Sequence, residues 1–162
     1  MSENGQENTN TTAGGNGKLH IFSASDATKK VTEINRDLVT LWKDIKFFTI
    51  QEFDSDDLID SGLKMNIEFV KVLDSIRKEC AFPFHINSGY RTPAKNALVG
   101  GKAGSAHLDG LACDIQITES GQRFKFIQVA LKHGITRIGI AKTFLHCDLD
   151  FKLPQGVCWL YS

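Results

Sequence analysis

The chain has 162 residues, a length typical of one domain with its own hydrophobic core. Hydrophobic residues make up 41% of it and charged residues 23%, as in an ordinary soluble globular protein. Lysine and arginine together number 19, as do aspartate and glutamate, so the chain lacks the basic excess of a nucleic-acid-binding protein.

Residues 1–17 differ from the rest of the chain in composition. Only Met1 and Ala13 are apolar there. Such a segment buries too little apolar surface to offset the entropy lost on ordering, so we predict a disordered tail at 1–17 and a single domain at 18–162. The N-terminus lacks the basic and apolar regions of a signal peptide, and no apolar run approaches the roughly 20 residues of a membrane span. We therefore expect synthesis in the cytoplasm and no membrane partner.

The first half of the domain is predicted to be helical. Apolar residues at helical spacing indicate one helix over about 26–48, packed on the core, and a second over about 63–80. Between them, FFTIQEFDSDDLIDSG indicates a short extended piece and a turn, with Asp60 or Ser61 as the N-cap of the second helix. A partner-binding role for the first helix is the alternative to core packing.

The second half alternates strands with loops and one further helix. FHINSGYRTP indicates a strand over 84–88 and a helix start at Pro93, and LACDIQI has the alternation of a strand. A helix over about 121–133 precedes TRIGIAKTFLHCDLD, whose two short alternating runs indicate a hairpin. The order of elements predicts an α+β fold with a small antiparallel sheet flanked by helices.

The four cysteines form no C-x-x-C pair, which disfavours a structural zinc knuckle or a redox motif. Because no secretion signal is present, we expect them to be buried, reduced thiols. They are Cys80, Cys113, Cys147 and Cys158.

Strand alternation brings three potential metal ligands to one face of the sheet. Asp114 in LACDIQI and His146 in FLHCDL share a face if their strands are neighbours, because alternate residues point the same way. Asp148 projects beside His146, and the turn at 108–110 carries His107 back over that face. Two histidines and a carboxylate, with a fourth position open for water, form the catalytic type of zinc site.

A structural explanation of these same residues stays open at this point. In it, His107 is a loop residue, Asp114 caps the end of a strand, and His146 is a hydrogen-bonded histidine on a half-buried face.

The segment SGYRTPAKNALVGGKAGSAHLDGLACDI, residues 88–115, resembles the zinc D-alanyl-D-alanine carboxypeptidase and L-alanyl-D-glutamate endopeptidase family, which includes phage endolysins and vancomycin-resistance dipeptidases. The family signature S-x-H-x-x-G-x-A-x-D is matched in full from Ser105 to Asp114, and FLHCDLD followed by Trp159 is also family-like. The resemblance covers about residues 47–160 and implies a fold of the hedgehog/D-Ala-D-Ala-peptidase type.

The resemblance implies a role for each matching residue. His107, Asp114 and His146 would bind zinc (Zn2+). Arg91 matches the family arginine that holds the substrate carbonyl or carboxylate, a role suited to a planar guanidinium, and stabilisation of the turn is its alternative role. Ser105 lies where the family serine lines the substrate pocket, and capping of the loop is the alternative.

The predicted general base departs from the family pattern. In several members an acidic residue or a histidine shortly before the last zinc histidine serves as the base, whereas this chain has Thr143 and Phe144 there. Neither side chain accepts a proton usefully at neutral pH. Asp148, on the same strand face as His146, is the predicted catalytic substitute, and orientation of the histidine is its alternative role.

Together these features predict a zinc metallopeptidase that hydrolyses bonds in the stem or cross-bridge peptides of bacterial peptidoglycan, next to a D-amino acid. We expect a monomeric phage or prophage lysis enzyme, made in the bacterial cytoplasm and acting at the cell wall after release or as a virion component. The alternative is a noncatalytic, zinc-stabilised phage structural or wall-binding module. A third possibility is a dipeptidase or amidase for small soluble peptides.

Overall fold

The computed structural model describes residues 24–161, so the tail predicted at 1–17 lies outside the described residues. The helices are α1 (Ala24–Leu41), α2 (Ile67–Cys80), α3 (Pro93–Leu98) and α4 (Ser120–Lys132). The strands are β1 (His85–Ser88), β2 (Ala112–Gln116), β3 (Arg137–Ile140), β4 (Phe144–Asp148) and β5 (Val157–Leu160). Short 3-10 helices cover Trp42–Asp44, Ile50–Phe53 and Ser61–Lys64. Within residues 24–161, every helix is too short or too polar to cross a membrane.

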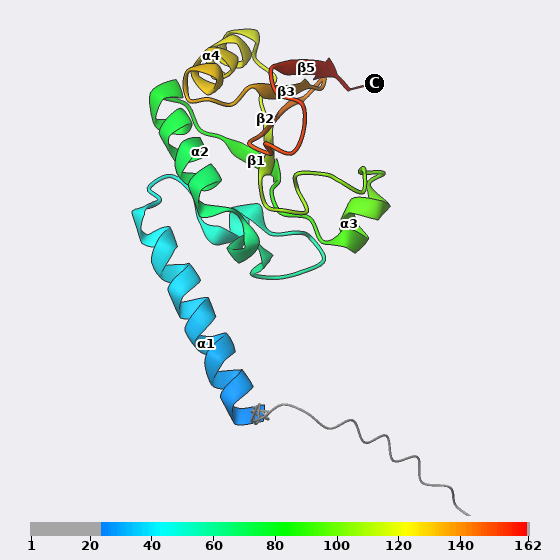
Figure 1. Ribbon diagram of the computed structural model, residues 1–162. Coiled ribbons are helices and arrows are strands. Elements are labelled where there is room, and N and C mark those ends of the chain that lie inside the picture. Colours follow the sequence, from blue (N-terminus) through cyan, green and yellow to red (C-terminus); the bar gives the residue numbers. More distant parts are fainter. Residues whose placement is uncertain (1–23, 162) are drawn as a thin grey trace, which may run out of the picture.

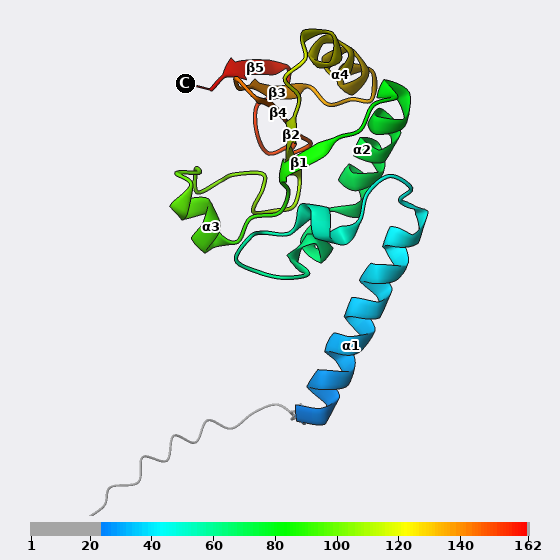
Figure 2. The ribbon, with the colours of Figure 1, turned by 180° about the vertical axis from the view of Figure 1, so that it is seen from behind.

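The strands form one sheet in the order β1-β2-β4-β3-β5. The predicted α+β class is confirmed, and so is the hairpin, because β3 and β4 pair as antiparallel neighbours. β1, β2, β4 and β3 pair antiparallel throughout, as predicted. The sequence does not indicate β5. This strand pairs parallel to β3 and makes the sheet mixed, because the chain crosses over after β4 to reach the outer edge of β3 (Figure 2).

The two faces of this sheet have different surroundings. One face packs against α2 and α4 (Figure 1) and holds apolar side chains, so we call it the core face. The other carries alternate, charged residues of the same strands, and we call it the polar face. The core face consists of Cys113, Ile115, Ile138, Leu145 and Cys147, all buried. The buried polar residues of the polar face are Asp114, Arg137, His146 and Asp148, and Ala112 and Gly139 lie among them in the register.

The start of α2 differs from the prediction. Its N-cap is Asn66, whose side-chain oxygen accepts hydrogen bonds from the amides of Glu68 at 3.0 Å and Phe69 at 3.2 Å. The predicted caps Asp60 and Ser61 instead begin a separate 3-10 turn. The predicted start at residue 63 is therefore too early, because asparagine satisfies the first free helix amides as well as aspartate or serine does.

Helix α1 is shorter and less buried than predicted. It ends at Leu41 rather than near residue 48, and the Leu41 side chain is 45% exposed. Trp42, in the 3-10 turn that follows, is buried. The prediction that this helix packs on the core is wrong for Leu41. Helix α1 meets the fold mainly at its C-terminal end and extends away from the sheet in both views (Figures 1 and 2).

All four cysteines are free, and three are buried as predicted. Cys158 is exposed, contrary to the prediction, because β5 is an edge strand of the sheet. Burial raises the pKa of the Cys113 and Cys147 thiols well above the usual value, so both stay protonated on the core face.

Candidate metal centre

The loop between α3 and β2 returns His107 to the polar face. Gly110 has a φ of 66°, in the left-handed region that glycine adopts most easily. A Cβ atom at this position would also lie 2.4 Å from the carbonyl oxygen of Lys64. On the other side of the turn, the Arg91 amide donates to the His107 carbonyl at 3.1 Å. The loop is therefore fixed from two directions.

Three ligand atoms meet on the polar face. His107 Nε2 lies 3.3 Å from His146 Nδ1 and 3.4 Å from Asp114 Oδ1, and the last two atoms are 2.8 Å apart. Asp114 and His146 are direct partners across β2 and β4, and all three side chains are buried. Ligands 2.0–2.2 Å from a tetrahedral zinc ion are roughly 3.3 Å from one another. The two separations from His107 match this value, and the His146–Asp114 separation of 2.8 Å is shorter, so such an ion fits once that one pair widens.

The second nitrogen of each histidine has a fixed acceptor. His107 Nδ1–H donates to the Gly89 carbonyl oxygen at 2.7 Å, and His146 Nε2–H donates to Asp148 Oδ2 at 3.0 Å. In the neutral rings these acceptors leave His107 Nε2 and His146 Nδ1, the nitrogens that face Asp114, without a proton and able to bind a metal ion. Metal-binding histidines have this arrangement, so the donor set fits a metal ion.

The electrostatics of the cluster favour a cation among these atoms. Burial lowers the pKa of His107. Burial acts in the same direction on His146, but its hydrogen bonds to Asp114 and Asp148 outweigh this effect and raise its pKa. For the Asp114 carboxyl, burial favours the neutral form, yet the two histidines more than compensate and lower its pKa. A proton on His146 or a metal ion supplies the positive charge that this carboxylate requires.

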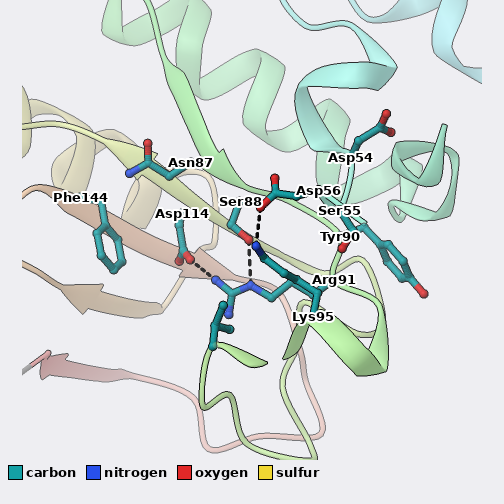
Figure 3. A pocket seen from close by; sticks show the side chains of 11 residues that line it. Asp54, Ser55, Asp56, Asn87, Ser88, Tyr90, Arg91, Lys95, Asp114 and Phe144 are labelled. Atoms are coloured by element: carbon teal, nitrogen blue, oxygen red, sulfur yellow. Dashed lines mark hydrogen bonds and ion pairs between the residues drawn. The ribbon is translucent and has the colours of Figure 1, made fainter. Parts of the chain in front are cut away.

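Arg91 lies next to Asp114 at the margin of the polar face. Its Nη2 donates to Asp114 Oδ2, and its Nε donates to Ser88 Oγ at 2.8 Å. Figure 3 shows the guanidinium between these two partners. Because Arg91 occupies Oδ2, Asp114 presents Oδ1 to the two histidines.

A cavity of about 270 Å³ opens beside Arg91 and Asp114. Lys95 and Asp56 form an ion pair at its wall (Figure 3), and Phe144 also lines it. The wall of the cavity therefore includes one of the three ligand residues, Asp114, together with side chains of both charges.

The predicted pocket residue Ser105 is not among the residues that line this cavity. Its amide donates to the Lys102 carbonyl at 3.0 Å, and its own carbonyl accepts from the Leu108 amide at 3.0 Å. These contacts hold the turn that carries His107.

Asp148 lies behind His146, away from the cavity. Its Oδ1 accepts from Arg137 Nε at 2.8 Å and from the Asp150 amide at 3.1 Å, while Oδ2 accepts from His146. Burial raises the pKa of this carboxyl, but the hydrogen bonds outweigh burial and lower it. With both oxygens engaged and only 1% of the residue exposed, the contacts favour the orienting role over the predicted proton transfer.

Strand β5 and its continuation bring aromatic rings to the centre. The centroids of the Trp159 and Tyr161 rings lie 5.3 and 6.4 Å from that of His146. Gly139 makes room for them, since a Cβ atom there would lie 2.6 Å from Tyr161 and 2.8 Å from Trp159. Sequence reasoning missed these contacts and the approach of Arg137 to Asp148. The alternation of RIGI, with arginine and glycine on one side, is the signal that places them on the polar face.

Comparison with protein families gives one result. A family model described as Peptidase M15 matches residues 46–148, which include Arg91, His107, Asp114 and His146. No curated protein matches the chain. The match spans well over half of the 162 residues, and the buried histidine–aspartate–histidine group lies within it. The resemblance seen in the sequence is thus confirmed, and the chain belongs to the peptidase M15 family of metal-dependent, usually zinc-dependent, peptidases.

Proposed function

We propose that this chain hydrolyses peptide bonds in the stem or cross-bridge of bacterial peptidoglycan, with zinc bound by His107, Asp114 and His146. The observation that carries the proposal is the convergence of three ligand atoms within 3.4 Å beside a cavity that Arg91 lines. Three protein ligands that leave a fourth position free are typical of catalytic zinc, whereas structural zinc sites are closed by four.

A zinc ion so bound would supply a Lewis acid and lower the pKa of water to about 7. The chain's own groups prepare the site for it. Gly89 and Asp148 hold the outer N–H groups of His107 and His146, so both rings keep one neutral nitrogen facing Asp114. These fixed orientations remove the cost of reorganising the ligands when the metal binds.

Arg91 is the residue we propose for substrate binding. Its Nε and Nη2 are engaged by Ser88 and Asp114, which fixes the plane of the guanidinium beside the cavity. Among residues 24–161, no hydrogen-bond partner is found for its Nη1. A planar donor held in this way suits the carbonyl oxygen or a carboxylate of a peptide substrate.

The charges of the cavity support a peptide that itself carries charged groups. Arg91 and Lys95 provide cations, while Asp54 and Asp56 provide carboxylates. Stem peptides of peptidoglycan carry free carboxylates, which fit this lining. We further propose, from the resemblance, that the protein is a monomeric phage or prophage lysis enzyme acting at the cell wall.

The test uses zinc-loaded protein and purified peptidoglycan, with new amino groups as the readout. Release is expected from the parent and not from His107→Ala, which loses a ligand. His85→Ala is the matched control, because His85 is an exposed histidine on β1 that is not part of the ligand set. Turnover of D-Ala-D-Ala without release from the wall would assign a dipeptidase instead. Zinc binding with no turnover of either substrate would overturn the proposal in favour of a noncatalytic module.

A further inference from the structure

Arg137 is a nearly buried arginine that the proposed reaction does not use. It begins β3, lies opposite Asp148 in the register of β4, and is only 9% exposed. A buried guanidinium has a large desolvation cost, so its partners need to compensate for that cost.

Two contacts of Arg137 lead to groups that surround His146. Its Nε donates to Asp148 Oδ1 at 2.8 Å, and Asp148 Oδ2 in turn accepts the His146 Nε2–H at 3.0 Å. Its guanidinium carbon lies 5.4 Å from the centre of the Trp159 ring, and that ring lies 5.3 Å from the His146 ring. Arg137 Nη1 also donates to the Pro154 carbonyl, which anchors the guanidinium to the loop before β5.

Arg137 therefore contacts both groups that restrain His146 from different sides. The carboxylate of Asp148 fixes the N–H edge of the imidazole, and Trp159 packs near the ring. Without Arg137, Asp148 would keep only the Asp150 amide on Oδ1 and would be freer to rotate. Rotation of this carboxylate would release the tautomer that directs His146 Nδ1 toward Asp114.

We propose that Arg137 is a positioning residue of the metal centre, which orients His146 through Asp148 and so sets the zinc affinity. The inference rests on the proposed zinc site, but not on the identity of the substrate. It predicts that Arg137 affects metal binding even when folding is unaffected.

The experiment measures the zinc Kd by competition with a chelator, and the melting temperature of the metal-free protein. Arg137→Gln is expected to raise the Kd by up to roughly 10-fold, the lower end of the range for groups bonded directly to a metal ligand, because Arg137 acts on His146 only through Asp148. Arg137→Lys keeps the positive charge but loses the planar guanidinium with its several donors, and it is expected to raise the Kd less. An unchanged Kd in Arg137→Gln, or in Arg137→Lys if the first variant does not fold, overturns the proposal.

Arg123→Gln is the matched control. Arg123 also ties strand ends together, donating to the carbonyls of Ile117 and Ala141, each at 2.7 Å, away from the ligands. We expect it to lower the melting temperature without changing the Kd. If it raises the Kd as much as Arg137→Gln does, the effect is general loosening of the sheet and the proposal fails.

A double-substitution cycle tests the route through Asp148. In an Asp148→Ala background, Arg137→Gln is expected to change the zinc Kd little further, because its intermediary is gone. Full additivity of the two losses would overturn the proposed route. A parent that binds zinc tightly but cleaves no peptide would refute the proposed function and leave this inference standing.

Discussion

The two faces of the sheet are built from alternate residues of the same strands, yet they bury opposite kinds of side chain. On the core face, apolar burial stabilises the fold by about 25 cal/mol per Å². On the polar face, burying each charge costs several kcal/mol unless a partner compensates. There, hydrogen-bonding groups follow one another in the order Arg91, Asp114, His146, Asp148, Arg137, and each carboxylate lies between an arginine and His146. The difference indicates that apolar burial on the core face stabilises the fold enough to hold the buried polar and charged groups of the polar face in place.

Asp114→Asn gives the sharpest test of the polar face. It removes the negative charge that the two histidines and Arg91 surround, while the volume of the side chain is kept. We expect zinc affinity to fall by more than the roughly 100-fold typical of partners behind the ligands, and peptidase activity to disappear. Metal content after dialysis and calorimetric titration measure this. Full zinc content and activity in the variant would remove Asp114 from the ligand set.

Leu145→Ala tests the core face at a position adjacent to His146. Leu145 is fully buried, so the cavity left behind is expected to lower the free energy of unfolding by about 2–5 kcal/mol. Urea denaturation of the metal-free protein measures this loss. Zinc affinity of the folded protein is expected to stay at the parent value. If affinity falls together with stability, the two faces are coupled and the comparison fails.

Gly139→Ala disturbs the polar face without touching a charge. The new methyl group would clash with Tyr161 and Trp159, so overpacking is expected to cost about 1–3 kcal/mol and to displace both rings from His146. Tryptophan fluorescence and thermal unfolding report the displacement and the cost. Gly104→Ala serves as control, because nothing lies within 4 Å of a Cβ atom there. Equal effects of the two substitutions would contradict the packing argument.

Glu79→Gln provides a partly exposed reference for the buried charges and has the smallest expected effect. Lys132 first, and then His133, hydrogen-bond to Glu79 and lower its pKa below the ordinary 4.5. A lowered folded-state pKa means that the contribution to stability is present above about pH 4.5 and is lost as the pH falls through the folded pKa. The melting temperature of the variant is expected to lie slightly below that of the parent at pH 7 and to coincide with it in acid. A difference in melting temperature between variant and parent that persists in acid would show that packing, and not the charge of Glu79, causes it.

Strand alternation predicts the ligand set because it depends only on local periodicity. Asp114 and His146 are partners across β2 and β4, as the period of two requires, and Gly110 lets the turn bring His107 to them. Features that depend on tertiary contacts are not predicted in this way. β5 is a four-residue segment that becomes a strand only because β3 offers it a free edge.

The role of Asp148 shows the same limit at the scale of one side chain. Its strand face is predicted correctly, which leaves both catalysis and orientation of His146 open. The choice between them depends on Arg137 and Asp150, whose contacts with Asp148 are set by the loop after β4 and by the register of β3. Helix α1 is a similar case, because its periodicity predicts an apolar stripe but not whether another element covers it.

The hydrogen bond from His107 to the Gly89 carbonyl means that the orientations of the two histidines differ in how easily substitutions can alter them. His146 is oriented by a carboxylate and, as proposed, by an arginine behind it, so substitutions can tune it in steps. His107 is oriented by the main chain, and a Cβ atom on Gly89 would lie 2.7 Å from Phe53, so the local backbone path has little freedom to shift. Substitutions that aim to change the metal preference of this protein are therefore best placed on the side of the centre formed by β3 and β4.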